Sequence, residues 1–204
     1  MVLPSWSACH AEVNGVSNAV FKKFPTYRQA ESFAFGTDHS EKRAEKSTPT
    51  PQEEVVVYTD GACPDQHTGI QETRVSGCGV WFGHGDERNV GVPNPYPPHT
   101  NNRAEMAAVL LAMQAFGKHQ PKRLCVMSDS EYVVKGMNEW MAGWKARRFA
   151  KVKNADLWQK LDDMRHEIGN VRFVHVRGHC GIEGNEEADR LANQGARMCE
   201  TAQK

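Results

Sequence analysis

The pattern of apolar and polar residues changes along the chain and divides it into zones. Residues 1–37 hold a short amphipathic pattern, residues 38–54 hold none, and residues 55–198 hold a long series of periodic segments. Residues 199–204 remain as a tail. Because burying an apolar face offsets the entropy lost on ordering, we expect a full domain only in the third zone.

The third zone predicts strands and helices in the order β-β-β-α-β-α-α-α-β-α. Strands are predicted where β-branched residues cluster, and helices where apolar residues recur every three or four positions. The predicted strands are 54–59, 75–83, 87–92, 123–128 and 171–176. The predicted helices are 102–116, 130–136, 139–149, 155–168 and 183–197. This order indicates an α/β fold with a mixed five-stranded sheet flanked by helices.

The first two zones differ in their capacity to fold. A short helix is predicted to open at Ser5-Trp6, a strand to cover Val20–Phe24, and a second helix to cover Tyr27–Phe35. These segments form a small, partial α/β module. The next stretch is rich in Ser, Thr, Pro and charge and has no apolar periodicity, so it is predicted to be a disordered linker.

Composition excludes several classes of protein. The chain has 25 Lys and Arg against 25 Asp and Glu, so bulk positive charge cannot hold nucleic acid, although a local basic patch can. No apolar stretch approaches the roughly 18 residues of a membrane span. The first 20 residues contain no Lys or Arg and contain Glu12, so no mitochondrial transit peptide is visible and we expect a nuclear or cytoplasmic protein.

The six cysteines are scattered, without a C-x-x-C pair. This pattern favours free thiols in a reducing compartment over a disulfide framework or a zinc site.

Four carboxylates stand where strand ends and helix starts would bring them together. Asp60 is placed at the end of the first strand, Asp129 follows the fourth, Glu105 lies in the long helix, and Asp189 in the last helix. Any one alone is typical of a helix cap or turn. Gathered at one end of a sheet, they repel one another unless a divalent cation neutralises them. Oxygen ligands favour Mg²⁺ or Mn²⁺, and two such ions suit displacement at phosphorus.

Four motifs, YTDGAC, TNNRAE, SDSEYV and GHCGIEGNEEAD, occur in this order between Val55 and Met198. They resemble the motifs of type 1 ribonuclease H in its eukaryotic form. The resemblance implies a ribonuclease H-like fold and an endonuclease that hydrolyses the RNA strand of RNA–DNA hybrids. It also implies two Mg²⁺ ions, which Mn²⁺ can replace, and products with 5′-phosphate and 3′-hydroxyl ends. We expect the enzyme to be a monomer.

The resemblance assigns roles to the acidic residues and to one histidine. It implies four metal-binding carboxylates: Asp60, Glu105, Asp129 and Asp189. The first would bridge both ions, the last would face the ion on the nucleophile side, and the other two the leaving-group side. His179, in a Gly178-x-x-Gly181 loop, matches a histidine that protonates the leaving group or assists product release. The alternative for His179 is an ordinary surface loop residue.

Contacts with the substrate follow from the same resemblance. Asn101 and Asn102 match a pair that reads the minor groove, where amides can donate to and accept from the RNA 2′-hydroxyls. Asn154 matches another such contact, and Thr100 a residue of the pocket for a DNA phosphate. Taken alone, an Asn before a helix is more often a cap.

A basic segment with interleaved aromatic residues follows Trp140. Residues 145–153 carry five basic groups and no acid. As a solvated helix face this pattern would be ordinary, but it also matches the family's basic protrusion, where aromatics line the DNA strand and Lys or Arg hold phosphates. The implied DNA contacts are Trp140, Trp144, Lys145, Arg147, Arg148 and Phe149.

The first zone resembles the second half of the hybrid-binding module that precedes the catalytic domain in eukaryotic relatives. The matching positions are Trp6, Phe21, Lys22 and Lys23. The usual module begins with two strands, and this sequence starts near their end, which predicts a truncated module. A vestigial or partly folded segment is the alternative.

Two rival functions remain open at this point. One is a nuclease or transposase of the same fold that cuts DNA by the same chemistry. The other is a hybrid-binding protein with an inactive site. TNNRAE and the GHCG loop favour ribonuclease H over the first, and the presence of all four acids argues against the second.

Overall fold

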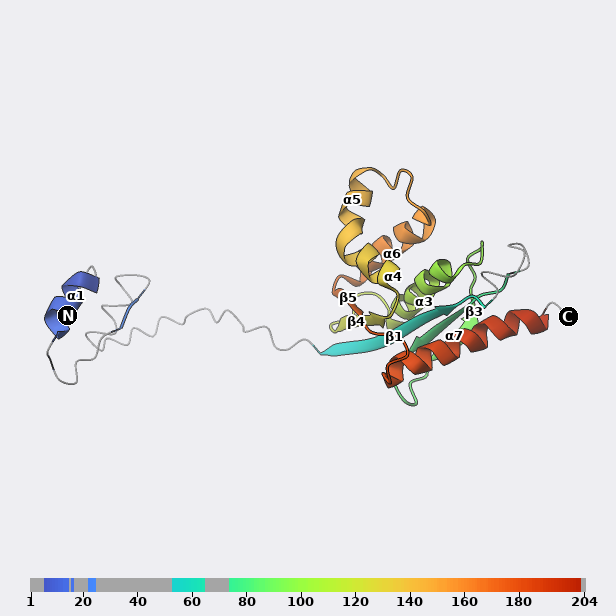
Figure 1. The fold of residues 1–204 in the computed structure, drawn as a ribbon, viewed down its shortest axis with the longest axis horizontal. Coiled ribbons are helices and arrows are strands. Elements are labelled where there is room, and N and C mark those ends of the chain that lie inside the picture. The colour runs from blue at the N-terminus through green and yellow to red at the C-terminus, as the bar shows by residue number, and fades with distance from the viewer. Residues whose placement is uncertain (1–5, 15, 17–21, 25–52, 65–73, 203–204) are drawn as a thin grey trace. The chain divides into compact units, whose positions relative to one another are not determined.

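The structure is a computed structural model that describes residues 6–14, 16, 22–24, 53–64 and 74–202. The chain divides into two compact units, residues 1–50 and 51–204 (Figure 1). No helix in the described ranges is long and apolar enough to cross a membrane.

The first unit contains helix α1 (Trp6–Val13), which confirms the predicted short helix. Residues 22–24, the described part of the predicted strand, do not have strand conformation. Instead, Lys22 Nζ lies 5.6 Å from the ring centroid of Phe24, a cation–π contact within the segment. Three predicted features lie outside the described residues: Phe21, the helix Tyr27–Phe35 and the linker up to residue 52.

The second unit is built on a five-stranded sheet in the order β3-β2-β1-β4-β5. Its strands are β1 (Glu54–Ala62), β2 (Gly77–Trp81), β3 (Val90–Pro93), β4 (Arg123–Ser128) and β5 (Val171–His175). β1, β2 and β3 pair antiparallel, whereas β1, β4 and β5 pair parallel. The mixed five-stranded sheet is therefore confirmed.

Strand β1 is longer than predicted, and this corrects the position of Asp60. The residue lies inside β1, because antiparallel pairing with β2 continues to Ala62. Parallel pairing of β1 with β4 ends at Tyr58, opposite Met127. Asp60 therefore lies just beyond the point where the β4 ladder stops, which brings it beside the residues that follow β4.

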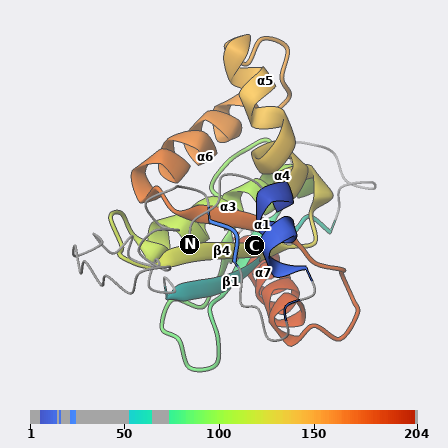
Figure 2. The same cartoon turned by 90° about the vertical axis from the view of Figure 1, so that its left-hand side faces the viewer.

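Five helices and one π-helical turn complete the described part of the second unit. They are α3 (Asn101–Phe116), α4 (Glu131–Lys135), η2 (Gly136–Trp140), α5 (Met141–Ala146), α6 (Ala155–Ile168) and α7 (Glu183–Ala202). Figures 1 and 2 show α7 on one face of the sheet and α3, α4 and α6 on the other. The predicted helix 139–149 begins in the π turn and ends at Ala146, and α7 includes residues 199–202, which we expected to form a tail.

Glycines allow the helices to lie close against the sheet at the acidic end. A Cβ added at Gly61 would overlap the backbone of Ala104 and Glu105, so only glycine allows α3 to approach β1 this closely. A Cβ at Gly79 would overlap the backbone of Ala188 in α7. These two contacts set Glu105 and Asp189 on either side of the strand that carries Asp60.

Candidate active site

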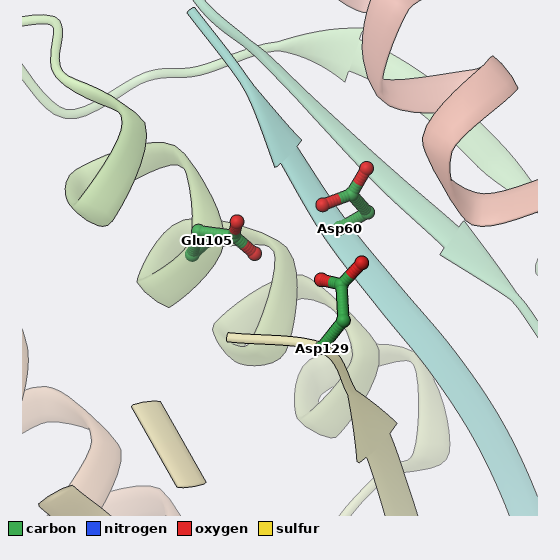
Figure 3. A group of neighbouring side chains, drawn as sticks. All are labelled: Asp60, Glu105 and Asp129. Atoms are coloured by element: carbon green, nitrogen blue, oxygen red, sulfur yellow. The ribbon is translucent and has the colours of Figure 1, made fainter. Parts of the chain in front are cut away.

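Three of the predicted acids come together from three different elements. Asp60 lies on β1, Glu105 on the second turn of α3, and Asp129 directly after β4. One carboxylate oxygen from each lies within 4.8 Å of the others, and Figure 3 shows the three side chains pointing toward a common space. We predicted that these acids would lie at two strand ends and a helix start. Their positions agree with this, except that Asp60 lies inside β1 and not at its end.

The fourth acid lines the same cleft. Asp189, on α7, is half-buried and lies close enough to Asp60 for a side-chain hydrogen bond to contribute to the pKa of Asp60. The cleft has a volume of about 390 Å³. It is lined by Asp60, Gly61, Ala62, Cys63, Pro64, Asn101, Glu105, Asp129, His179, Asp189 and Asn193.

Two capping hydroxyls fix the chain on either side of the acids. The Thr100 side chain accepts a hydrogen bond from the backbone N–H of Arg103 at 3.3 Å, which starts α3 one turn before Glu105. Ser130 accepts from the N–H of Val133 at 3.4 Å and starts α4 directly after Asp129. The backbone that carries these two acids is therefore held by local hydrogen bonds.

Electrostatic repulsion in the cleft is strong. Burial, followed by the charges of Asp129 and Asp189, raises the pKa of Asp60 to about 7. Burial, followed by the charges of Asp60 and Asp129, also holds the pKa of Glu105 well above its usual range. None of the ion pairs among the described residues involves any of these acids.

Glu105 carries a further sign of an incomplete site. Its Oε2 atom is buried and has no hydrogen-bond partner among the described residues. A buried carboxylate oxygen without a donor is costly. A hard divalent cation would supply the missing partner, so the donor set fits Mg²⁺ or Mn²⁺.

Asparagine side chains contact three of the four acids. Asn101 Nδ2 lies 3.4 Å from Glu105 Oε1, Asn185 Nδ2 donates to Asp129 Oδ2 at 3.0 Å, and Asn193 Nδ2 donates to Asp189 Oδ1 at 3.1 Å. The sequence analysis did not select Asn185 or Asn193. A signal for Asn193 was available, because its four-residue spacing from Asp189 on a helix makes the two side chains neighbours.

His179 lies at the cleft on an exposed loop. Its φ of 53° is in the left-handed region, and Gly181 follows with a φ of 76°. The loop comes between β5 and α7, so the imidazole lines the cleft without belonging to a helix or strand. This position is compatible with the proton-transfer role that the motif predicts.

Comparison with known proteins identifies the family. A family model described as RNase H matches residues 52–197, which include all four acids. This chain belongs to the ribonuclease H family. A second model, described as the Ribonuclease H1 N-terminal domain, matches residues 1–34.

Individual relatives agree with the ribonuclease H assignment. Ribonuclease H of Polaromonas sp. strain JS666 is 44% identical over 152 residues, covering 72% of this chain and 90% of that protein. Ribonuclease H1 of Rattus norvegicus is 30% identical and covers 98% of this chain and 86% of that protein. The crystal structure of LC9-RNase H1, a type 1 RNase H with the type 2 active-site motif, has a TM-score of 0.58 and 32% identity, covering 72% of this chain and 74% of that one.

The expected DNA-binding surface of this ribonuclease H contains a cluster of aromatic rings that are tilted against one another. Ring centroids of Trp140 and Trp144 lie 5.5 Å apart, and those of Trp144 and Trp158 lie 4.9 Å apart. Trp140 is 37% exposed, whereas Trp158 is fully buried. Trp140 is therefore the aromatic most accessible to a substrate, and Trp144 links it to the core.

The basic residues beside these aromatics are not equivalent. Lys145 Nζ lies 2.6 Å from Asp162 Oδ2, so this lysine is already paired with an acid of α6. Arg147 and Arg148 are exposed, and Arg148 and Phe149 have φ values of 52° and 57°. Two exposed arginines in a strained turn thus remain as candidate phosphate contacts, while Lys145 is a weaker candidate than predicted.

Asn154 occupies a structural network in the ribonuclease H domain. It has a left-handed φ of 59°, its Nδ2 donates to Tyr132 Oη at 3.3 Å, and its Oδ1 accepts from Arg103 at 3.4 Å. Arg103 is buried and forms a two-pronged ion pair with Asp156 at 2.9 and 2.7 Å. This network, which sequence reasoning missed, joins the start of α3 to the start of α6.

The predicted contacts of the N-terminal unit are described only in part. Trp6 begins α1, but its side chain and all of Phe21 lie outside the described residues. Lys22 and Lys23 are both exposed. Asn102 completes the predicted set, half-buried on the first turn of α3.

Proposed function

We propose that this ribonuclease H hydrolyses the RNA strand of RNA–DNA hybrids with two Mg²⁺ ions, which Mn²⁺ can replace. The ions would be held by Asp60, Glu105, Asp129 and Asp189. The observation that carries this proposal is the convergence of three acids, with oxygens within 4.8 Å of one another and no basic partner among the described residues. Such a group is stable in its charged form only beside a cation.

The four acids would hold the two ions on opposite sides of the scissile phosphate. Asp60 would contact both ions, Asp189 the ion on the nucleophile side, and the remaining two acids the ion on the leaving-group side. When bound, the ions activate water and stabilise the leaving oxygen in an in-line displacement. The products carry 5′-phosphate and 3′-hydroxyl ends.

His179 supplies the mobile proton in this scheme. The imidazole lies at the cleft on an exposed loop, and imidazole is the side chain that most often serves as a general acid or base. It protonates the leaving 3′ oxygen or assists product release, which contributes less to the rate than the acids.

Recognition of the hybrid divides between its two strands. Asn101, which lines the cleft, and Asn102 on the same turn would contact the 2′-hydroxyls of RNA. Trp140, Arg147 and Arg148 form the exposed surface proposed for the DNA strand, with stacking from the indole and phosphate contacts from the guanidiniums.

A cleavage assay on the full chain tests this proposal. In Mg²⁺ or Mn²⁺, we expect the RNA strand of an end-labelled RNA–DNA hybrid to be cut and its DNA strand to stay intact. In EDTA, we expect both strands to stay intact. Duplex DNA and duplex RNA of the same sequence are the comparisons. Cleavage of duplex DNA at a similar rate would favour the rival nuclease, and binding without cleavage would favour an inactive binding protein.

Two further properties are proposals about the protein in the cell. We propose that it acts as a monomer, which sedimentation of the full chain tests, and that it resides in the nucleus or cytoplasm, which imaging of a tagged chain tests. A dimer in sedimentation, or exclusive mitochondrial signal in imaging, would contradict the respective proposal.

A further inference from the structure

Helix α7 carries two asparagines that bind acids of the cleft. Asn185, on its first turn, is 2% exposed and donates from Nδ2 to Asp129 Oδ2 at 3.0 Å. Asn193, two turns later, lines the cleft and donates from Nδ2 to the Asp189 carbonyl oxygen at 3.0 Å and to Oδ1 at 3.1 Å. One helix thus contacts two acids that come from different elements.

The surroundings of Asp129 show how the hydrogen bond from Asn185 helps to orient its carboxylate. A Cβ added at Gly178 would lie 2.7 Å from Asp129 Oδ2, so the loop backbone closes one side of that oxygen. Asn185 Nδ2 occupies another side. With Oδ2 held in this way, the carboxylate is fixed in the orientation seen in Figure 3, where it faces Asp60.

The chemical type of the donor matters as much as its position. A Lys or Arg at the same place would neutralise the acid and compete with a divalent cation. An amide orients a carboxylate through a hydrogen bond and leaves its negative charge available. An amide is therefore the kind of partner that a cation-binding carboxylate can have.

The burial of Asn185 argues against a role in packing alone. Its Oδ1 atom is buried without a hydrogen-bond partner among the described residues. An amide at this position therefore carries the free-energy cost of a buried, unpaired acceptor. An apolar residue of similar volume would avoid that cost. Among the described residues, the hydrogen bond from Nδ2 to Asp129 is the only contact of this side chain that requires an amide.

We propose that Asn185 and Asn193 are positioning residues that orient Asp129 and Asp189 for divalent cation binding. This inference rests on the proposed function, since it assumes that the acids hold cations. Loss of either amide lets its carboxylate rotate, which weakens cation affinity while the hybrid-binding surface is unchanged.

Cation affinity of the full chain, measured with Mn²⁺ alone, tests the inference without requiring turnover. The variants are Asn193→Ala, Asn185→Ala and Asn185→Leu, the last of which keeps the buried volume if Ala disturbs folding. Gln194→Ala, on an exposed position of the same helix, is the matched control. We expect the Asn variants to bind Mn²⁺ about 10-fold more weakly and the control to match the wild-type chain.

Steady-state cleavage of a hybrid, measured on the same preparations, separates positioning from a structural role. We expect the Mg²⁺ concentration for half-maximal rate to rise about 10-fold, with KM for the hybrid within twofold and recovery of the rate at high Mg²⁺. Wild-type Mn²⁺ affinity and Mg²⁺ dependence in folded variants would overturn the inference. Failure of the wild-type chain itself to cleave would instead contradict the proposed function.

Discussion

Asp60 and Asp129 face each other across the end of the parallel pair formed by β1 and β4. The β4 ladder stops at Tyr58, and Asp129 follows the last residue of β4, so both carboxylates enter the same space. Burial and then the charge of Asp129 raise the pKa of Asp60 to about 7. The fold therefore holds two like charges together at a cost to its own stability, which a bound cation relieves.

This relationship predicts how the stability of the cation-free protein depends on pH. The pKa of Asp60 is about 7 in the folded state against an ordinary 3.8, so the folded chain keeps this proton where the unfolded chain has lost it. The stabilisation from protonated Asp60 is complete below pH 3.8 and is lost as the pH rises through about 7. Asp60→Asn removes this loss and should stabilise the protein by about 1 to 3 kcal/mol at pH 8.

Urea unfolding in EDTA at pH 5 and pH 8 measures this effect. Asp163→Asn, at an exposed aspartate of α6, serves as the control and should behave like the wild-type chain. A wild-type protein and an Asp60→Asn variant with the same change in stability between the two pH values would contradict the prediction.

Removal of the loop histidine should slow cleavage without abolishing it. We expect His179→Ala to lose roughly 10- to 100-fold in kcat, because a proton carrier assists chemistry that the acids dominate. Steady-state cleavage of a labelled hybrid measures kcat, and His119→Ala, at another exposed loop histidine, is the control. Complete inactivity of a folded His179→Ala protein would show that this residue has a larger role.

The structure divides the basic segment into residues with different expected contributions to binding. Arg147→Ala combined with Arg148→Ala should flatten the slope of log K against log salt by about 2, because each lost phosphate contact releases about one counterion fewer. Lys145→Ala should change the slope by less than about 1, since Lys145 is paired with Asp162. Titrating a labelled hybrid at several salt concentrations provides the slopes, and an unchanged slope in the double variant would place the DNA strand elsewhere.

The N-terminal unit should contribute little to cutting short substrates. Residues 1–50 form a unit separate from residues 51–204. A short hybrid has room for one contact, so a second, tethered binding unit adds little to the affinity for it. Deleting residues 1–50 should leave the rate on short hybrids within about threefold of the full chain. On long hybrids, a tenfold loss of successive cuts after this deletion would show that the unit increases processivity.

Much of the fold and site was predictable from the sequence because local patterns determine it. Helices α3 and α6 follow from apolar periodicity, and β4 from a run of buried apolar residues. The acids could be grouped because the motifs lie at strand ends and helix starts. That reasoning placed Asp60 at a strand end and could not see that pairing with β2 extends β1 past it.

Contacts between residues far apart in sequence could not be predicted in the same way. A basic run such as that around Lys145 does not show which lysine pairs with an acid of another helix. Likewise, the hydrogen bond from Asn185 to Asp129 depends on how α7 lies against the sheet. That close approach is made possible by Gly79, whose role is visible only in three dimensions.

The substitution Asp129→Asn tests the central claim, that carboxylates at this sheet end hold the cations that hydrolyse RNA. The variant keeps the size and hydrogen-bonding shape of the side chain but removes the charge that a divalent cation requires. The measurement is single-turnover cleavage of a labelled RNA–DNA hybrid in Mg²⁺, with hybrid affinity determined on the same preparation. We predict unchanged affinity and a rate below about a tenth of wild type; a rate above that level, in a variant that still binds the hybrid, would contradict the account.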